Sequence, residues 1–131
     1  MGDALSIAVS GLNAASLRMD AAASNIANAS DTAPLASQPG QPRPYQPVDV
    51  VQTAVLNGGT TAGIEPVNPA SNAIFDPGSP FADTNGLVAS PNVDLAQQLV
   101  NTITARISYD ANAKVLHAAA REQGYLLNIF T

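Results

Sequence analysis

The chain has 131 residues and a net charge of −5, and alanine supplies 24 of its 60 apolar residues. Leu, Ile, Val and Phe together number only 31. This share of large apolar residues is only a little above the level below which a chain cannot bury enough surface to fold by itself. The five basic residues do not cluster, which argues against a nucleic-acid or anionic-membrane surface, and the lack of cysteine excludes thiol chemistry and disulfides. We therefore expect a chain that depends on partners for its stability.

Proline divides the sequence into three parts, because all ten prolines and six of the nine glycines fall between residues 34 and 91. Proline breaks helix interiors. The pattern predicts an N-terminal helix in residues 1–32, a Pro/Gly-rich middle in residues 33–91 and a C-terminal helix in residues 92–131, the two helices forming one helical domain. The expected fold class is mainly α: long terminal helices packed as a coiled-coil-like pair, with one small β-hairpin in an irregular, proline-rich middle.

The first helix is predicted over residues 3–28, where a large apolar side chain recurs every seventh residue and alanines take the mating positions. Such alternation of large and small residues allows another helix to approach closely. The large positions are Leu5, Leu12, Met19 and Ile26, and the small ones are Ala8, Ala15 and Ala22. The opposite face carries only two charges, fewer than a solvated helix usually has, so we expect protein contacts on more than one side.

The middle begins with five prolines in residues 34–47, which predict an extended linker. Valines at 48, 50, 51 and 55 predict a strand, Asn57-Gly58-Gly59 a turn, and residues 60–67 the returning strand of a β-hairpin. A lone hairpin is marginal in water, so it is expected to pack on another element. Two further turns are expected at residues 75–78 and 83–86.

The second helix is predicted to begin after Pro91, where Asn92 or Asp94 is suited to cap it and Asp94 with Gln97 has the spacing of a capping box. A helix from there to residue 130 would be about 55 Å long at ~1.5 Å per residue. A compact globule of this size is only ~36 Å across, so the helix is expected to leave its domain and meet another chain. Its apolar positions form two stripes that drift around the helix: Leu95, Leu99, Ile103 and Ile107, then Tyr109, Ala113, Leu116, Ala120, Gln123, Leu127 and Phe130.

No residue pattern supports catalysis, a cofactor or a metal site. His117 is the only histidine, and it is expected to be an ordinary helix residue. Residues 83–86 have the start of a calcium loop but lack its remaining ligands and its final glutamate. Glu65 and Glu122 are the only glutamates, and neither has a supporting group nearby in the sequence. We expect a protein that is not an enzyme.

Both ends of the chain resemble one known family. SGLNAA at residues 10–15, RMD at 18–20 and SNIANA at 24–29 resemble the N-terminal signature of bacterial flagellar rod and hook proteins. DPGSP at residues 76–80, PNVD at 91–94 and YDAN at 109–112 resemble more closely the proximal-rod C type of the basal-body rod proteins. The resemblance covers about half the chain, since residues 33–72 match only loosely.

This resemblance implies a structural subunit of the flagellar proximal rod, which assembles helically and transmits torque from the motor to the hook. It implies type III export into the periplasm-spanning rod without a cleaved signal peptide. The implied partners are copies of the chain, other rod proteins, and the membrane-ring and export-gate proteins at the rod base, with no nucleic acid and no membrane insertion. The residues expected to pack against other subunits are Leu5, Leu12, Met19, Ile26, Asn25, Asn28, Leu95, Leu99, Ile103, Tyr109, Asn112, Leu116 and Leu127.

Other interpretations remain open from the sequence. The asparagines either fix register across subunits, as polar seam residues do in coiled coils, or are simply solvated. The chain could be another short rod subunit of the B type. It could also be a soluble helical-hairpin adaptor or chaperone, which would fold alone and stay in the cytoplasm. A wall-cutting hydrolase would need a catalytic carboxylate in a cleft, for which the sequence offers no candidate.

Overall fold

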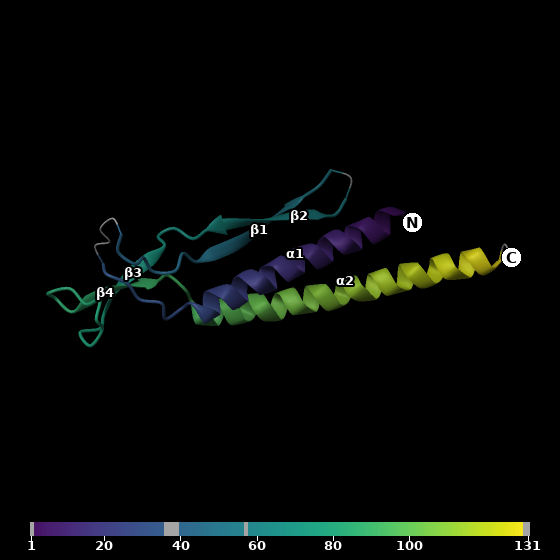
Figure 1. Cartoon of the computed structure of the whole chain (residues 1–131). Coiled ribbons are helices and arrows are strands. Elements are labelled where there is room, and N and C mark those ends of the chain that lie inside the picture. Colours follow the sequence, from purple (N-terminus) through teal and green to yellow (C-terminus); the bar gives the residue numbers. More distant parts are fainter. Residues whose placement is uncertain (1, 36–39, 57, 130–131) are drawn as a thin grey trace.

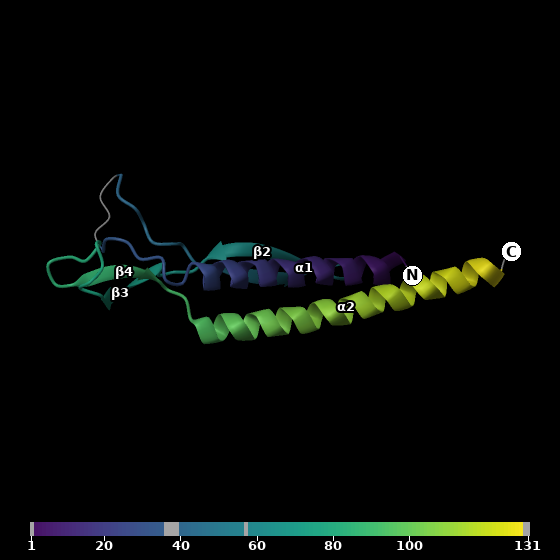
Figure 2. The same cartoon turned by 60° about the horizontal axis from the view of Figure 1, so that its bottom comes forward.

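Two long helices and two small antiparallel sheets make up the computed structural model, which describes residues 2–35, 40–56 and 58–129. Helices α1 and α2 run antiparallel and side by side, and α1 lies between α2 and the first sheet (Figure 1). The second sheet lies beyond the end of the helix pair where α1 ends and α2 begins (Figure 2). The elements are α1 Gly2–Ala27, β1 Val48–Ala54, β2 Thr60–Pro66, β3 Ser71–Phe75, β4 Leu87–Pro91 and α2 Leu95–Ile129.

The fold class expected from the sequence, a mainly α chain with a single hairpin, is wrong. The terminal helices and the β1–β2 hairpin are present, but β3 and β4 form a second antiparallel sheet that the prediction lacked. Strand β3 is short and has no clear alternation of apolar and polar residues. Strand β4 ends in Pro91, which pairs with Ser71 at the margin of the ladder, where a missing N–H is tolerated.

The predicted helix ends are close to the observed ones. The carboxylate Oδ1 of Asp94 accepts the backbone N–H groups of Ala96 at 2.9 Å and Gln97 at 3.1 Å, so Asp94 is the N-cap of α2. The side chain of Gln97 donates to Asn101 at 3.1 Å rather than back to the cap. The cap is therefore confirmed, but the reciprocal bond of a capping box is replaced by one along the helix.

The core between the helices consists mainly of alanine. The small seam positions of α1 are buried, whereas the large ones are only half-buried. The buried apolar residues are Ala8, Ala14, Ala15, Ala21 and Ala22 of α1, Ala105 of α2, Val88 and Ala89 of β4, and Ala33. A Cβ atom added to Gly11 would lie 2.6 Å from Nδ2 of Asn112, so the α1 backbone almost touches α2 at this point. Small residues thus set a short distance between the helices.

Helix α2 is longer than its partner: it has 35 residues, and α1 has 26. Because Gly11 meets Asn112 and the helices are antiparallel, Gly2 lies near position 121 of α2. Residues 122–129 therefore extend past α1, as Figure 1 shows. At about 1.5 Å per residue, this extension is roughly 12 Å long. Neither helix, over its described residues, is both long and apolar enough to cross a membrane.

Candidate assembly surface

Asn25 of α1 forms hydrogen bonds with the open end of the β1–β2 hairpin, where β1 begins. Its Nδ2 donates to the carbonyl of Val48 at 2.8 Å, and its Oδ1 accepts the N–H of Val48 at 3.1 Å. A neighbouring β-strand would make the same pair of bonds, so the side-chain amide takes the place of a strand residue. The side chain is 1% exposed, and both of its polar groups are satisfied within the chain.

Tyr45 ties the linker to the same place. Its hydroxyl donates to Oδ1 of Asn25 at 3.1 Å, which leaves the Ser24 hydroxyl as the donor of the 2.9 Å bond between Ser24 and Tyr45. The backbone N–H of Tyr45 donates to Oδ2 of Asp31 at 3.1 Å. The chain leaving α1 is therefore brought back to the last turns of that helix before β1 begins.

Ser10 fastens the other end of the hairpin. Its Oγ accepts the N–H of Thr60 at 3.1 Å and donates to the carbonyl of Ile7 at 2.8 Å. Gly58 and Gly59 both have φ +88°, a conformation that favours glycine. A Cβ atom on Gly59 would lie 2.6 Å from Oγ of Ser10, so the turn rests directly on α1. The hairpin is held at both ends, and α1 provides both anchors.

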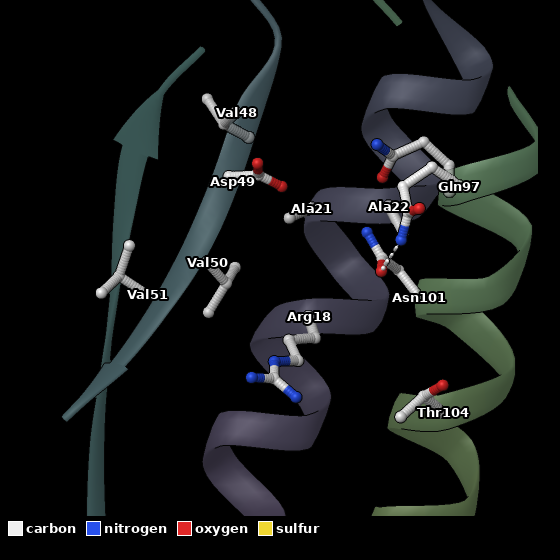
Figure 3. Close-up of a pocket in the computed structure, with 11 residues that line it drawn as sticks. Arg18, Ala21, Ala22, Val48, Asp49, Val50, Val51, Gln97, Asn101 and Thr104 are labelled. Atoms are coloured by element: carbon white, nitrogen blue, oxygen red, sulfur yellow. Dashed lines mark hydrogen bonds between the residues drawn. The ribbon is translucent and has the colours of Figure 1, made fainter. Parts of the chain in front are cut away.

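A groove runs along α1 between the hairpin and α2. One stretch of about 450 Å³ has alanines of α1 as its floor, strand β1 as one wall and polar side chains of α2 as the other (Figure 3). A second stretch of about 390 Å³ continues toward the turn of the hairpin. Arg18 lines both stretches. The α2 wall is Gln97, Gln98, Asn101 and Thr104.

An apolar stripe on α2 remains open to solvent in the single chain. Its members are between 50% and 64% exposed, although they are large aliphatic residues. The stripe is Leu95, Leu99, Ile103 and Ile107, and Val100 beside it is similarly exposed. A contiguous exposed apolar surface of this kind is typical of a protein–protein contact.

The predicted packing residues occupy three kinds of position. Leu5, Leu12, Met19, Ile26, Asn28, Asn112 and Leu116 are half-buried, Asn25 is buried, and Leu95, Leu99, Ile103 and Tyr109 are exposed. Side-chain Nδ2 groups of Asn28 and Asn112 each donate at 2.8 Å to a carbonyl four residues earlier in their own helix. The side chain of Leu127 lies outside the part of the chain that the structure describes. The role of these residues between subunits stays a prediction.

Ser10 and Tyr45 were not foreseen, because their partners lie 50 and 20 residues away in the sequence. Gly11 did carry a signal, since an isolated glycine inside a helical pattern often marks a close approach of another element.

The loop between β3 and β4 is held by Asp83. Its Oδ1 accepts the N–H of Leu87 at 2.9 Å and that of Asn85 at 2.8 Å. These hydrogen bonds, the one from Leu87 foremost, lower the pKa of Asp83 below its ordinary value, although desolvation acts in the opposite direction. Among the described residues no group of three or more His, Asp or Glu side chains is placed to hold a metal ion. Asp83 therefore acts as the cap of a turn.

A thin alanine core, an exposed apolar stripe and a helix that outruns its partner define a class of protein, the subunit built to pack into a larger helical assembly. Comparison with known proteins gives the particular family. The family model described as "Flagella basal body rod protein" matches residues 5–33, and the one described as "Flagellar basal body rod FlgEFG protein C-terminal" matches residues 84–129.

Curated relatives extend this similarity over most of the chain. "Flagellar basal-body rod protein FlgC" of Yersinia enterocolitica is 44% identical over 117 residues, which cover 85% of this chain and 84% of the relative. The protein of the same name in Salmonella typhimurium is 39% identical over the same shares. The chain belongs to the FlgC family of flagellar basal-body rod proteins, and the resemblance inferred from its two ends is confirmed.

Proposed function

We propose that this chain is a structural subunit of the rod in the flagellar basal body, located in the proximal rod and assembled helically to transmit torque from the motor to the hook. The family to which it belongs supports this function. The structural observation that carries it is the stripe from Leu95 to Ile107, an apolar surface that the described residues leave at least half exposed.

Packing of this stripe supplies the attraction between subunits. Full burial of a large aliphatic side chain contributes about 1.5–3 kcal/mol. The four stripe residues are at least half exposed, so covering each would contribute about 1 kcal/mol, or about 4 kcal/mol per stripe. Alanine-lined seams then allow close contact between stiff helices, which suits a shaft that must resist twisting.

The remaining roles follow from this proposal. Residues 1–32 and 92–131 act as one helical domain of the tube, and residues 33–91 lie outside it; the packing of α1 on α2 supports this division. The chain reaches the rod by type III export without a cleaved signal peptide. Its partners are other rod proteins, further copies of itself, and membrane-ring and export-gate proteins at the rod base. It has no enzymatic activity, in keeping with relatives that are named as rod proteins.

Mass spectrometry of purified hook–basal bodies, compared with the cytoplasmic fraction, tests the proposal. We expect the chain to be enriched in the basal bodies at a few copies per structure. Absence from the basal bodies together with a folded cytoplasmic pool would contradict the rod function and favour a helical-hairpin adaptor.

A matched pair of variants tests the stripe itself. Ile103 is 60% exposed in the single chain, so Ile103→Arg should leave the helix content of the isolated protein unchanged. We expect Ile103→Arg to abolish incorporation into basal bodies and swimming, because a charge would be buried in the contact. Ile103→Leu keeps the apolar volume and should assemble normally. Normal assembly of Ile103→Arg would show that this stripe is not a subunit contact.

A further inference from the structure

The hydrogen-bond pattern of the hairpin shows which backbone groups of β1 face away from β2. The N–H of Val55 donates to Gly59 at 3.2 Å, and the N–H of Val67 donates to Pro47 at 2.9 Å. Pairs in an antiparallel ladder alternate between bonded and non-bonded. With the observed register, even-numbered residues of β1 therefore direct their N–H and C=O to the outer edge. The bonds from Asn25 to both groups of Val48 confirm this parity.

This outer edge is occupied at one point and open at the next two. Asn25 takes both groups of Val48, but the outward N–H and C=O of Val50 and Gln52 have no partner within residues 2–35, 40–56 and 58–129. Val50 lines the first stretch of the groove and Gln52 the second. The open edge is thus one wall of the groove, facing α2 across the floor of α1 (Figure 3).

From this geometry we propose that the groove receives an extended segment of a neighbouring rod subunit, which pairs with β1 as a third strand. The inference rests on the proposed function, because assembly would exclude water from the groove. An unpaired backbone N–H or C=O is unfavourable once water is gone. A helix could fill the space, but its backbone groups are free only at its ends. An extended strand offers such groups at every second residue, as in β-augmentation.

The lining of the groove defines the chemistry of this segment. Ala21 and Ala22 lie on the α1 side, where a close approach requires small side chains. Among the described residues, Arg18 lines both stretches and Asp49 lines the first, so the two opposite charges offset each other there and favour an uncharged side chain. Amide and hydroxyl groups of α2, including Asn101 and Thr104, are within the opposite wall and suit a peptide backbone. The partner is therefore a short, extended segment with small, uncharged side chains.

The direct test is a cryo-electron microscopy map of hook–basal bodies containing this chain. We expect extended density in the groove, running alongside β1 at the strand spacing of about 4.8 Å. A helix in the groove, or a groove that stays empty in the rod, overturns the inference but leaves the rod function intact. If the chain is absent from the basal bodies, the proposed function fails and this inference fails with it.

A pair of variants tests the backbone bond itself. Among the backbone hydrogen-bonding groups of β1, Gln52→Pro removes only one outward N–H, because the ladder bonds of β1 are made by its odd-numbered residues. Gln52→Ala keeps the N–H and serves as the control. We expect incorporation into basal bodies to be at least tenfold lower for Gln52→Pro than for Gln52→Ala, with hairpin amides equally protected in both isolated proteins. Normal incorporation of Gln52→Pro overturns the inference. If the isolated Gln52→Pro protein loses the hairpin, the cryo-electron microscopy density in the groove of the parent protein is the test that supports or overturns the inference.

Discussion

Replacing Asn25 with alanine should release the hairpin from α1. The substitution removes two bonds to Val48 and one from the hydroxyl of Tyr45, all between 2.8 and 3.1 Å. Because a two-stranded hairpin is marginal by itself, undocking should also expose the amides of the β1–β2 ladder to solvent. The effect should therefore be larger than the loss of one side chain suggests.

The magnitude follows from the three bonds. Each contributes about 1 kcal/mol net, and a buried group left unpaired costs up to about 3 kcal/mol. Val48 and Tyr45 are half-buried, so water will satisfy part of what they lose. We expect the free energy of undocking to fall by about 3 kcal/mol. At 1.4 kcal/mol per factor of ten, the population of the open form rises about a hundredfold.

Hydrogen exchange of the β1 and β2 amides in the isolated chain measures this population. Asn28→Ala is the control, because the side-chain amide of Asn28 donates to the carbonyl of Ser24 in its own helix. Ladder amides should exchange about a hundredfold faster in Asn25→Ala and nearly as in the parent protein in Asn28→Ala. Equal exchange in the two variants would refute the view that Asn25 holds the hairpin.

Three further outcomes are expected. Gly11→Ala would place a Cβ atom 2.6 Å from the nearest side-chain atom of α2 and should destabilise the isolated chain by about 1–3 kcal/mol in thermal unfolding. Gly124→Ala, with open space around it, should instead stabilise α2 by up to ~1 kcal/mol. Equal effects of the two substitutions would contradict the close contact of α1 with α2 at Gly11. Because the pKa of Asp83 is lowered, its carboxylate fully stabilises the β3–β4 loop at pH values above the ordinary pKa of about 3.9, and this stabilisation is lost as the pH falls through the lowered pKa. The protection of the Leu87 amide from exchange should fall over the same pH range, and Asp83→Asn should remove this pH dependence. Amides of residues 122–129, which extend past α1, should exchange rapidly in the isolated chain and slowly in the rod, and slow exchange in both would show that this segment is stable without partners.

The sequence was most informative where structure is local. Seven-residue spacing predicted α1 almost to its ends. Asn92 and Asp94 were the two candidate caps of α2, and Asp94 is the observed one; helices and their caps depend on residues within a few positions. The hairpin followed from the valines of the first strand and the Gly-Gly turn after it, for the same reason.

The sequence was least informative where contacts join distant segments. Strand β4 pairs with β3, and its Ala89 also forms an isolated antiparallel bridge with Ala33. Its stability therefore comes from distant segments that cannot be predicted from the five residues of the strand itself. Asn25 lies on the helical seam and looked suited to fix register between subunits, but its polar atoms are occupied by Val48 and Tyr45, more than 19 residues away. The sequence predicts that an asparagine at such a helix position will form hydrogen bonds, but it does not predict which residues are its partners.

The antiparallel helix pair brings Gly2 and the end of α2 to one pole of the molecule, and the loop between β3 and β4 lies at the other (Figure 1). A fluorescent or affinity label joined at either terminal helix would thus crowd the same region. Gly78 in the distant loop is exposed, and the closest atom to a Cβ there would be 3.7 Å away. An insertion beside Gly78 is therefore the position from which a label could follow the subunit with both helix ends left free.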